Sequence, residues 1–139
     1  MTNYVLDSSF ALAWALPDET SDQADRFFSR IRGKYAFWVP ALWWYEISNA
    51  LIMAQRRRRL TEPDRIRVAE IYEALPIQTD VRLGPDIIRH FHALAQDHGL
   101  SAYDTAYLEL AQRKGFELAT LDQNLIKAAR KTGVKVVRA

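Results

Sequence analysis

The chain has 139 residues, 49% of them hydrophobic, and no cysteine, which suits one domain with a buried core and excludes disulfides, zinc-thiolate sites, iron–sulfur clusters and thiol nucleophiles. Its formal net charge of +2 is mildly basic and by itself points only weakly to nucleic acid. No apolar run is long enough to span a membrane, and the opening MTNYVLDSSF lacks the charged start and long apolar stretch of a signal peptide. We therefore expect a single domain over residues 1–139, soluble, cytoplasmic and without a membrane partner.

Short runs rich in β-branched and aromatic residues alternate with longer helical patterns along the chain. Each interval is long enough for one or two helices, and strands joined by such crossovers form a mostly parallel sheet with helices on both faces. The sequence therefore predicts an α/β fold. The predicted strands are NYVLD, YAFWVP, PIQTDV, FELATLD and VKVVR, at residues 3–7, 35–40, 76–81, 116–122 and 134–138.

The five glycines have structural places in this pattern. Four of them follow helical stretches that end in polar or basic residues, and the fifth precedes Pro85 at the expected start of a helix. No glycine is left for a phosphate-binding loop or a G-x-S-x-G nucleophile turn. P-loop NTPases and α/β-hydrolases are therefore excluded.

Acidic residues follow two of the predicted strands. Asp7 closes the first strand in YVLDSS, and Asp122 closes the fourth in LATLDQNL. Each could simply cap the helix that begins next. Ligands of open parallel sheets, however, bind beyond the carboxyl ends of the strands, so both residues are also candidates for a functional site.

Asp104 lies in a predicted amphipathic helix within LSAYDTAYLELAQRKG, residues 100–115. It projects at the edge of the apolar face, where a capping box with Ser101 could explain it, whereas an unpartnered buried carboxylate needs a proton or a cation. At about 100° per residue the helix has an apolar face and a polar face. The apolar face is formed by Tyr103, Tyr107, Leu108, Leu110 and Ala111, and the residues expected to face water are Thr105, Glu109 and Gln112.

Glu46 lies in PALWWYEISNALIMAQ, a predicted helix that is apolar almost all round for its first three turns. Its neighbours along the helix are Leu42, Ala50 and Met53, so Glu46 should face inward with them. A glutamate is almost never buried without a partner. The partner could be a distant arginine or a metal ion.

The four acids could converge on one edge of the sheet. Two carboxylates about 4 Å apart repel by about 4 kcal/mol at an effective dielectric constant near 20, so a cluster of four requires cations. Ligands that are all oxygen, without cysteine or histidine, suit the hard cations Mg²⁺ and Mn²⁺. The sequence therefore favours a divalent-metal site held by Asp7, Glu46, Asp104 and Asp122.

Four segments of the chain, in this order, carry those acids: YVLDSSFALAW, PALWWYEISNAL, LSAYDTAYLELAQRKG and ELATLDQNLIKAA. With these motifs the chain resembles the PIN-domain family over essentially its full length, and in particular the small VapC-type toxins of bacterial and archaeal toxin–antitoxin pairs. The resemblance implies a PIN fold with a parallel sheet ordered 3-2-1-4-5. It also implies Mg²⁺- or Mn²⁺-dependent endonucleolytic cleavage of RNA.

The same resemblance assigns roles to individual residues. Asp7, Glu46, Asp104 and Asp122 correspond to the acidic quartet, and the supporting residues are Thr120, Ser8 and Asn49. We hypothesise that metal held by Asp7 and Asp104, and shared with Glu46 or Asp122, activates a water for in-line attack on a phosphodiester. Gln123 and Asn124 stand where some members of the family have another acid, which leaves a second metal site in question.

Two partners follow from the resemblance, a second copy of the chain and an antitoxin segment that covers the N-terminal helices and blocks the acidic site.

Adjacent Trp43 and Trp44 cannot both point into a single core. The run FALAWAL, residues 10–16, is apolar on every side. The fold could bury these stretches, or they could form an exposed apolar patch for a partner.

Basic side chains and histidines lie outside the acidic motifs. Arg56, Arg57, Arg58 and Arg59 end the helix of Glu46, roughly 15–20 Å beyond it at 1.5 Å per residue, and could either face water or follow RNA phosphates. His90 and His92 point in different directions on a helix, and His98 is near its end. These positions disfavour a paired-histidine ribonuclease.

Three other classes share parts of this pattern. A receiver-like phospho-acceptor domain could use Asp80, but the chain lacks the pair of acids after the first strand and has Arg138 in place of the final lysine. A haloacid-dehalogenase-type phosphatase needs a second aspartate where this chain has Ser9. A catalytically inactive PIN-like binding module would keep the fold and lose acids, and all four are present.

Overall fold

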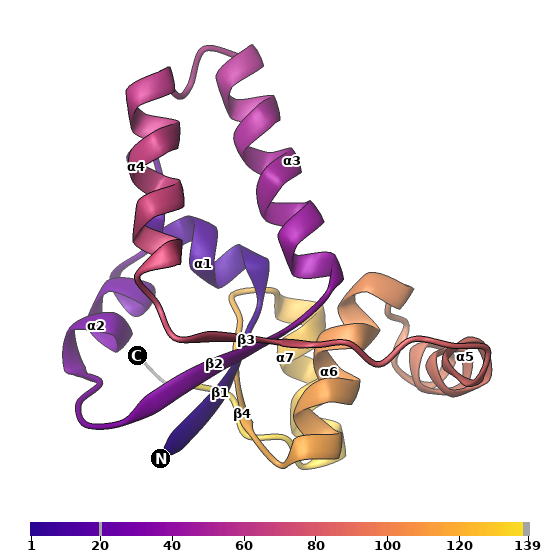
Figure 1. Ribbon diagram of the computed structural model, residues 1–139. Coiled ribbons are helices and arrows are strands. Elements are labelled where there is room, and N and C mark those ends of the chain that lie inside the picture. The colour runs from indigo at the N-terminus through magenta and orange to yellow at the C-terminus, as the bar shows by residue number, and fades with distance from the viewer. Residues whose placement is uncertain (20, 138–139) are drawn as a thin grey trace.

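The computed structural model of the chain describes residues 1–19 and 21–137. Within these ranges a four-stranded sheet lies between two layers of helices (Figure 1). The strands are β1 (Thr2–Leu6), β2 (Tyr35–Pro40), β3 (Ile77–Asp80) and β4 (Glu117–Ala119). The helices are α1 (Ser8–Ala15), α2 (Asp22–Arg30), α3 (Leu42–Arg56), α4 (Glu62–Glu73), α5 (Asp86–His98), α6 (Ala102–Lys114) and α7 (Gln123–Thr132).

The sheet is parallel throughout and has the order β3-β2-β1-β4, as expected for these strands. Leu6 pairs with Ala119 in its register, and the Asp7 N–H donates to the Ala119 carbonyl at 3.0 Å. The central strand β1 and its neighbour β4 therefore end level with each other. The residues that follow them, Asp7 and Thr120, emerge together at the carboxyl edge of the sheet.

The prediction of a fifth strand at 134–138 is wrong in the described residues. Val136 forms only an isolated parallel bridge with Leu118, supported by backbone hydrogen bonds from Leu118 to Lys135 and from Val137 to Leu118. Because β4 is three residues long, it offers this segment little edge to pair with. The segment still lies beside β4, where a fifth strand of the expected order would be, and Arg138 lies outside the described residues.

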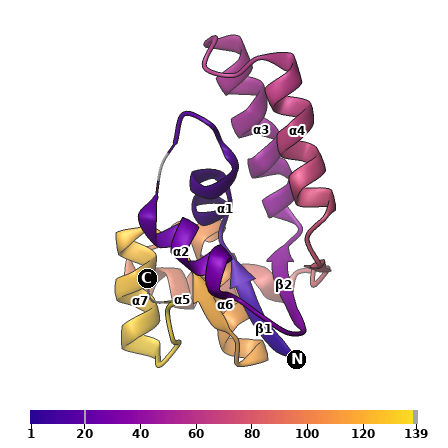
Figure 2. The ribbon, with the colours of Figure 1, turned by 90° about the vertical axis from the view of Figure 1, so that its left-hand side faces the viewer.

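Side chains of the central strands alternate between the two helical layers. Tyr4 and Phe37 pack against Phe27 of α2, in an aromatic cluster that Phe10 of α1 extends. Trp38, next to Phe37 along β2, points to the other face, where Lys114 of α6 lies over its ring. The sheet is therefore covered by α1 and α2 on one side and by α6 on the other, as Figures 1 and 2 show.

The apolar N-terminal stretch is largely buried by the fold. In α1 the side chains of Phe10, Ala11 and Ala13 are buried, and Trp14 stacks on Phe28 of α2. In α3 Trp43 is fully buried while Trp44 is 42% exposed, which confirms that only one of this pair enters the core. Most of the apolar surface that could have served a partner is therefore internal.

Helix α6 is buried on more sides than an amphipathic helix would be, because it packs on the sheet and against both α5 and α7. The predictions that Thr105 and Glu109 face water are wrong, since both are buried, whereas Gln112 is exposed as expected. Tyr103, expected on the apolar face, is 66% exposed because it lies in the first turn, ahead of the buried segment.

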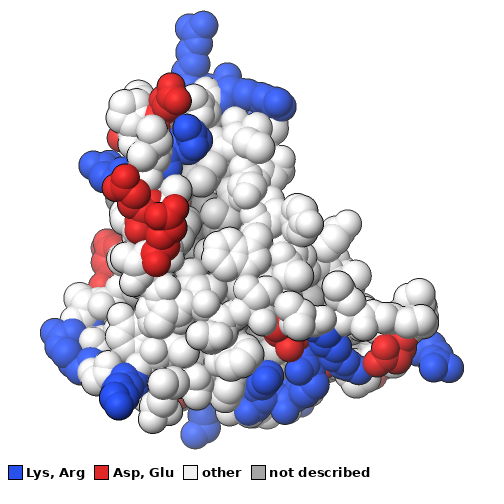
Figure 3. All heavy atoms as spheres, viewed as in Figure 1, with Lys and Arg blue, Asp and Glu red and all other residues white. Residues whose placement is uncertain are grey.

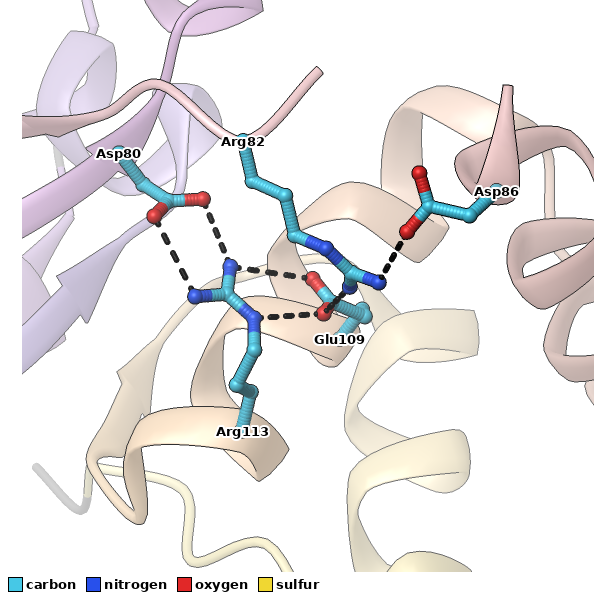
Figure 4. A network of polar contacts seen from close by, with 5 residues as sticks. All are labelled: Asp80, Arg82, Asp86, Glu109 and Arg113. Atoms are coloured by element: carbon cyan, nitrogen blue, oxygen red, sulfur yellow. Dashed lines mark hydrogen bonds and ion pairs between the residues drawn. The ribbon is translucent and has the colours of Figure 1, made fainter. Parts of the chain in front are cut away.

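Glu109 is buried because two arginines neutralise it (Figure 4). Its Oε1 atom accepts hydrogen bonds from Arg82 at 2.5 Å and from Arg113 at 2.7 Å. Arg113 also binds Asp80 at the end of β3, and Arg82 binds Asp86 at the start of α5. This five-residue network fixes the segment between β3 and α5 against α6.

Helices α3 and α4 form a hairpin that projects away from the sheet (Figures 1 and 2). Arginine side chains gather at its tip, drawn in blue in Figure 3, where Arg56, Arg57 and Arg58 are exposed. Arg59 turns back and pairs with Asp18 at 2.7 Å. Among the described helices, none combines the length and apolar character needed to cross a membrane.

Candidate active site

Four helices begin near the carboxyl edge of the sheet, and each carries one of the predicted acids at or near its start. Asp7 directly precedes α1, Asp122 directly precedes α7, Asp104 lies in the first turn of α6, and Glu46 is the fifth residue of α3. The starts of these helices lie close together in Figure 1. Helix N-termini carry partial positive charge, so this edge of the fold suits anionic groups.

Asp7 is the most deeply buried of the four, with 4% of its surface exposed. It does not cap α1 with its side chain; instead its Oδ2 atom accepts hydrogen bonds from Thr120 Oγ1 at 2.6 Å and Ser9 Oγ at 2.7 Å. Burial raises the pKa of Asp7, and the charges of Glu46 and Asp122 raise it further. The capping alternative is therefore wrong for Asp7.

Asp122 does cap its helix. Its Oδ1 atom accepts a hydrogen bond from the Leu125 N–H at 2.9 Å, and its own N–H donates to Thr120 Oγ1 at 3.0 Å. One hydroxyl, that of Thr120, thus links both strand-end aspartates. Burial is the main cause of the raised pKa of Asp7 and of Asp104, and the Asp122 carboxylate adds to the rise in both.

Asp104 is half-buried, and its backbone N–H donates to Ser101 Oγ at 3.1 Å, so Ser101 caps α6. Burial raises the pKa of the Asp104 carboxyl, and the charges of Asp122 and Asp7 add to this rise. Asp104 therefore interacts electrostatically with two of the other acids.

Glu46 is half-buried, like the helix neighbours Leu42, Ala50 and Met53 with which it was expected to face inward. It lies beside the buried face of α3, which is formed by Trp43, Ile47, Leu51 and Ala54. Its Oε1 atom accepts a hydrogen bond from the Tyr107 hydroxyl at 2.5 Å. Burial raises the pKa of Glu46, and the charge of Asp104 raises it further. Within the described residues Glu46 forms no ion pair, so the alternative of a distant arginine partner is wrong there.

These influences connect all four acids into one electrostatic group. Each member raises the pKa of at least one other, and none is paired with a lysine, arginine or histidine of the described segments. The described aspartate, glutamate and histidine side chains do not already include three arranged to hold an ion.

The donor set fits a hard divalent cation. The four candidate ligands are all carboxylates, and no described cation is paired with them. A hard divalent cation such as Mg²⁺ or Mn²⁺ would relieve their mutual repulsion. The supporting residue Thr120 lies where it was expected, in contact with Asp7. Asn49 is exposed, so no support from it is visible.

Two residues of the site were missed in the sequence. The Ser9 hydroxyl donates to Asp7, whereas in the sequence Ser9 stands out only as a departure from the phosphatase pattern. The helical period places Tyr107 on an apolar face, but its hydroxyl binds Glu46. The spacing offered a signal for Tyr107, because residues three apart share one side of a helix and Asp104 is three positions earlier.

The residues that a receiver domain or a paired-histidine ribonuclease would use lie outside the group of four acids. Asp80 is held in an ion pair by Arg113 at 2.7 Å, as a structural acid would be. His90 and His92 are exposed on α5, which agrees with the prediction that they are not a catalytic pair.

The sequence model of the PIN domain matches residues 4–131. The chain belongs to the PIN-domain family. This membership excludes the receiver and haloacid-dehalogenase interpretations, since the match covers nearly the whole chain.

Among known proteins, Ribonuclease VapC3 of Pyrobaculum aerophilum is 32% identical over 125 residues, which cover 87% of this chain and 90% of that protein. The crystal structure of PAE2754 from the same organism has a TM-score of 0.69 at 25% identity and covers 98% of this chain and 84% of that one. Mycobacterium tuberculosis VapC20, described as a sarcin-ricin loop cleaving toxin, has a TM-score of 0.68 at 17% identity, with 99% and 100% of the two chains covered. At this identity the likeness to VapC20 shows the shared fold alone.

Proposed function

We propose that this PIN-domain protein is a divalent-metal-dependent endoribonuclease and the toxin of a VapBC-type toxin–antitoxin pair. The observation that carries the proposal is the group of four carboxylates at the carboxyl edge of the sheet, which have no described cation as a partner. Burial and the charges of neighbouring members raise the pKa of Asp7, Glu46 and Asp104. The 32% identity to Ribonuclease VapC3 supports RNA as the substrate class.

In this proposal Asp7 and Asp104 hold a Mg²⁺ or Mn²⁺ ion and share it with Glu46 or Asp122. When bound, such an ion supplies an activated water and stabilises charge on the phosphoryl and leaving oxygens. The chain contributes the positions of the ligands, since Ser9 and Thr120 fix Asp7 through its Oδ2 atom. The N-termini of the surrounding helices favour the approach of a phosphate group.

Basic side chains at a distance from the acids could extend the contact with RNA. The exposed side chains Arg56, Arg57 and Arg58 lie at the tip of the α3–α4 hairpin, away from the acids, and can bind backbone phosphates of an extended RNA (Figure 3). Their contact with RNA predicts an affinity that falls steeply with salt. The alternative, that these arginines only face water, predicts that their replacement leaves the salt dependence unchanged.

The proposed partners are an antitoxin and a second copy of the chain. Exposed apolar side chains remain on α3, where Tyr45 is 78% exposed beside Glu46 and Ile52 is 46% exposed. An antitoxin segment that covers such side chains would also shield the acids. A gene for a small antitoxin next to the gene for this chain would support this part of the proposal.

Cleavage of RNA by the purified chain tests the proposal. The expected result is cleavage with Mn²⁺ or Mg²⁺, its loss in excess chelator, and its loss in Asp104→Asn. Mapping of 5′ ends after induction in cells then identifies the RNA. Activity that survives both the chelator and Asp104→Asn would overturn the mechanism, and metal binding without cleavage of any RNA would favour the inactive binding module.

A further inference from the structure

Tyr107 connects α6 to α3, two helices of the candidate site that otherwise pack against different parts of the fold. Helix α3, which carries Glu46, packs mainly on α1, α4 and β2, whereas α6, which carries Asp104, packs on the sheet, α5 and α7. The Tyr107 hydroxyl on α6 donates to Glu46 Oε1 on α3, and these residues are 61 positions apart in the chain. The bond therefore spans the gap between two acid-bearing helices.

The surroundings of Tyr107 leave its hydroxyl few alternatives. The residue is fully buried, so a phenol without a partner would be costly there. Ser8, at the start of α1, interacts through its side chain with both Tyr107 and Glu46. The tyrosine ring is held by the core, and its hydroxyl is directed at one carboxylate oxygen.

We propose that Tyr107 is a positioning residue that fixes the rotamer of Glu46 by binding its Oε1 atom, so that the Glu46 carboxylate is presented to the ion-binding edge that Asp7 and Asp104 share. The inference rests on the proposed function, because it assigns Glu46 to the metal ligands. A carboxylate that is already oriented loses less conformational freedom when it binds an ion. Without Tyr107 the half-buried Glu46 carboxylate would keep only its interaction with Ser8.

The test compares Tyr107→Phe with two matched tyrosine variants. Tyr72→Phe also removes a buried hydroxyl, one that donates to the Ala11 carbonyl at 2.8 Å. Tyr103→Phe removes an exposed hydroxyl from the same helix. The readouts are the Kd of Mn²⁺ from calorimetry of the full chain and the Tm without metal.

Tyr107→Phe is expected to weaken Mn²⁺ binding about tenfold, the lower end of the usual effect of removing a residue that orients a metal ligand. Tyr72→Phe should lower the Tm and leave the Kd of Mn²⁺ unchanged, and Tyr103→Phe should change neither. If the role is positioning, raising the Mn²⁺ concentration should restore RNA cleavage in Tyr107→Phe.

A double-mutant comparison separates positioning from a general loss of packing. In a Glu46→Gln background, Tyr107→Phe should cause much less further loss of Mn²⁺ affinity, because its effect acts through the carboxylate. The proposal is overturned if Tyr107→Phe binds Mn²⁺ as wild type does, or if its effect is equally large in Glu46→Gln. A wild-type chain that fails to bind Mn²⁺ overturns the proposed metal dependence and the role of Tyr107 with it, whereas normal binding and cleavage in Tyr107→Phe overturn only the latter.

Discussion

Asp7 at the end of β1 and Thr120 at the end of β4 are 113 residues apart in the chain, and the Thr120 hydroxyl donates to the Asp7 carboxylate over 2.6 Å. The contact follows from the parallel pairing of the two strands, which brings their carboxyl ends level. The same hydroxyl accepts the N–H of Asp122. One side chain thus sets the spacing of two acids from opposite ends of the sequence.

Replacement of Thr120 by valine should disturb this arrangement while keeping the shape of the side chain. We expect a loss of about 1–3 kcal/mol in the free energy of unfolding, because a buried donor and acceptor are removed and the Asp122 N–H loses its partner. RNA cleavage should fall as well, since Asp7 is no longer fixed. Thr132→Val is the control, because its hydroxyl binds only carbonyls within α7; equal losses of cleavage in both variants would contradict the role of Thr120.

Replacement of Asp104 by asparagine should stabilise the metal-free protein while abolishing cleavage. Burial raises the pKa of Asp104 and the charges of Asp122 and Asp7 raise it further, so a neutral side chain is less costly to bury and relieves repulsion. The gain should be about 0.5–2 kcal/mol, the usual range for improved charge arrangement, and is measured by thermal or denaturant unfolding. Asp97→Asn, at an exposed position of α5, should change neither stability nor cleavage. If Asp104→Asn is instead less stable than wild type, the folded protein contains a group that stabilises the charge of Asp104, and the prediction is contradicted.

The stability of the metal-free protein should fall as the pH rises above the ordinary carboxyl range. The pKa values of Asp7 and Asp104 are raised from 3.8 and that of Glu46 from 4.5, so the folded chain holds protons that the unfolded chain has already released. Stability from these neutral forms is fully present below the unfolded pKa and is lost as the pH passes the folded pKa. Unfolding curves recorded across this pH range should show that the free energy of unfolding declines less in Asp7→Asn than in wild type. An identical decline in the two proteins would contradict a raised pKa for Asp7.

The ion network around Glu109 should matter to stability and not to chemistry. Glu109→Ala leaves Arg82 and Arg113 without their shared partner, and loss of one partner of a buried ion pair costs about 3–5 kcal/mol. We expect the lower end of that range, because both arginines are partly exposed. Glu62→Ala, which breaks an exposed pair with Arg65, should cost less than about 1 kcal/mol. Folded Glu109→Ala should bind Mn²⁺ as wild type does, and a weakened Kd would mean that the network also shapes the acidic site.

Much of the site could be predicted because its parts follow from local rules. Acids at strand ends belong to the carboxyl edge of a parallel sheet, which placed Asp7 and Asp122 in one region. The helical period predicts that Glu46 faces inward, and in the structure it is half-buried and bound to Tyr107. These inferences needed only the direction of each element.

The remaining features depend on contacts between distant segments. Thr105 and Glu109 look solvent-facing by the helical period, but α5, α7 and the sheet enclose α6 together. The spacing of four residues between Glu109 and Arg113 is typical of an ion pair within one helix. The second partner, Arg82, is 27 residues away in the chain, and no local spacing indicates it. The hydroxyl bond of Tyr107 to Glu46 likewise required knowledge of how α3 approaches α6.

The central claim is that folding gathers Asp7, Glu46, Asp104 and Asp122 into one site for a divalent cation. Anomalous X-ray diffraction from crystals grown with Mn²⁺ tests it most directly. We expect a strong Mn²⁺ peak within bonding distance of the carboxylates of Asp7 and Asp104, with Glu46 or Asp122 turned toward it. A fully bound Mn²⁺ at another place, or no peak at these carboxylates at saturating Mn²⁺, would contradict the account.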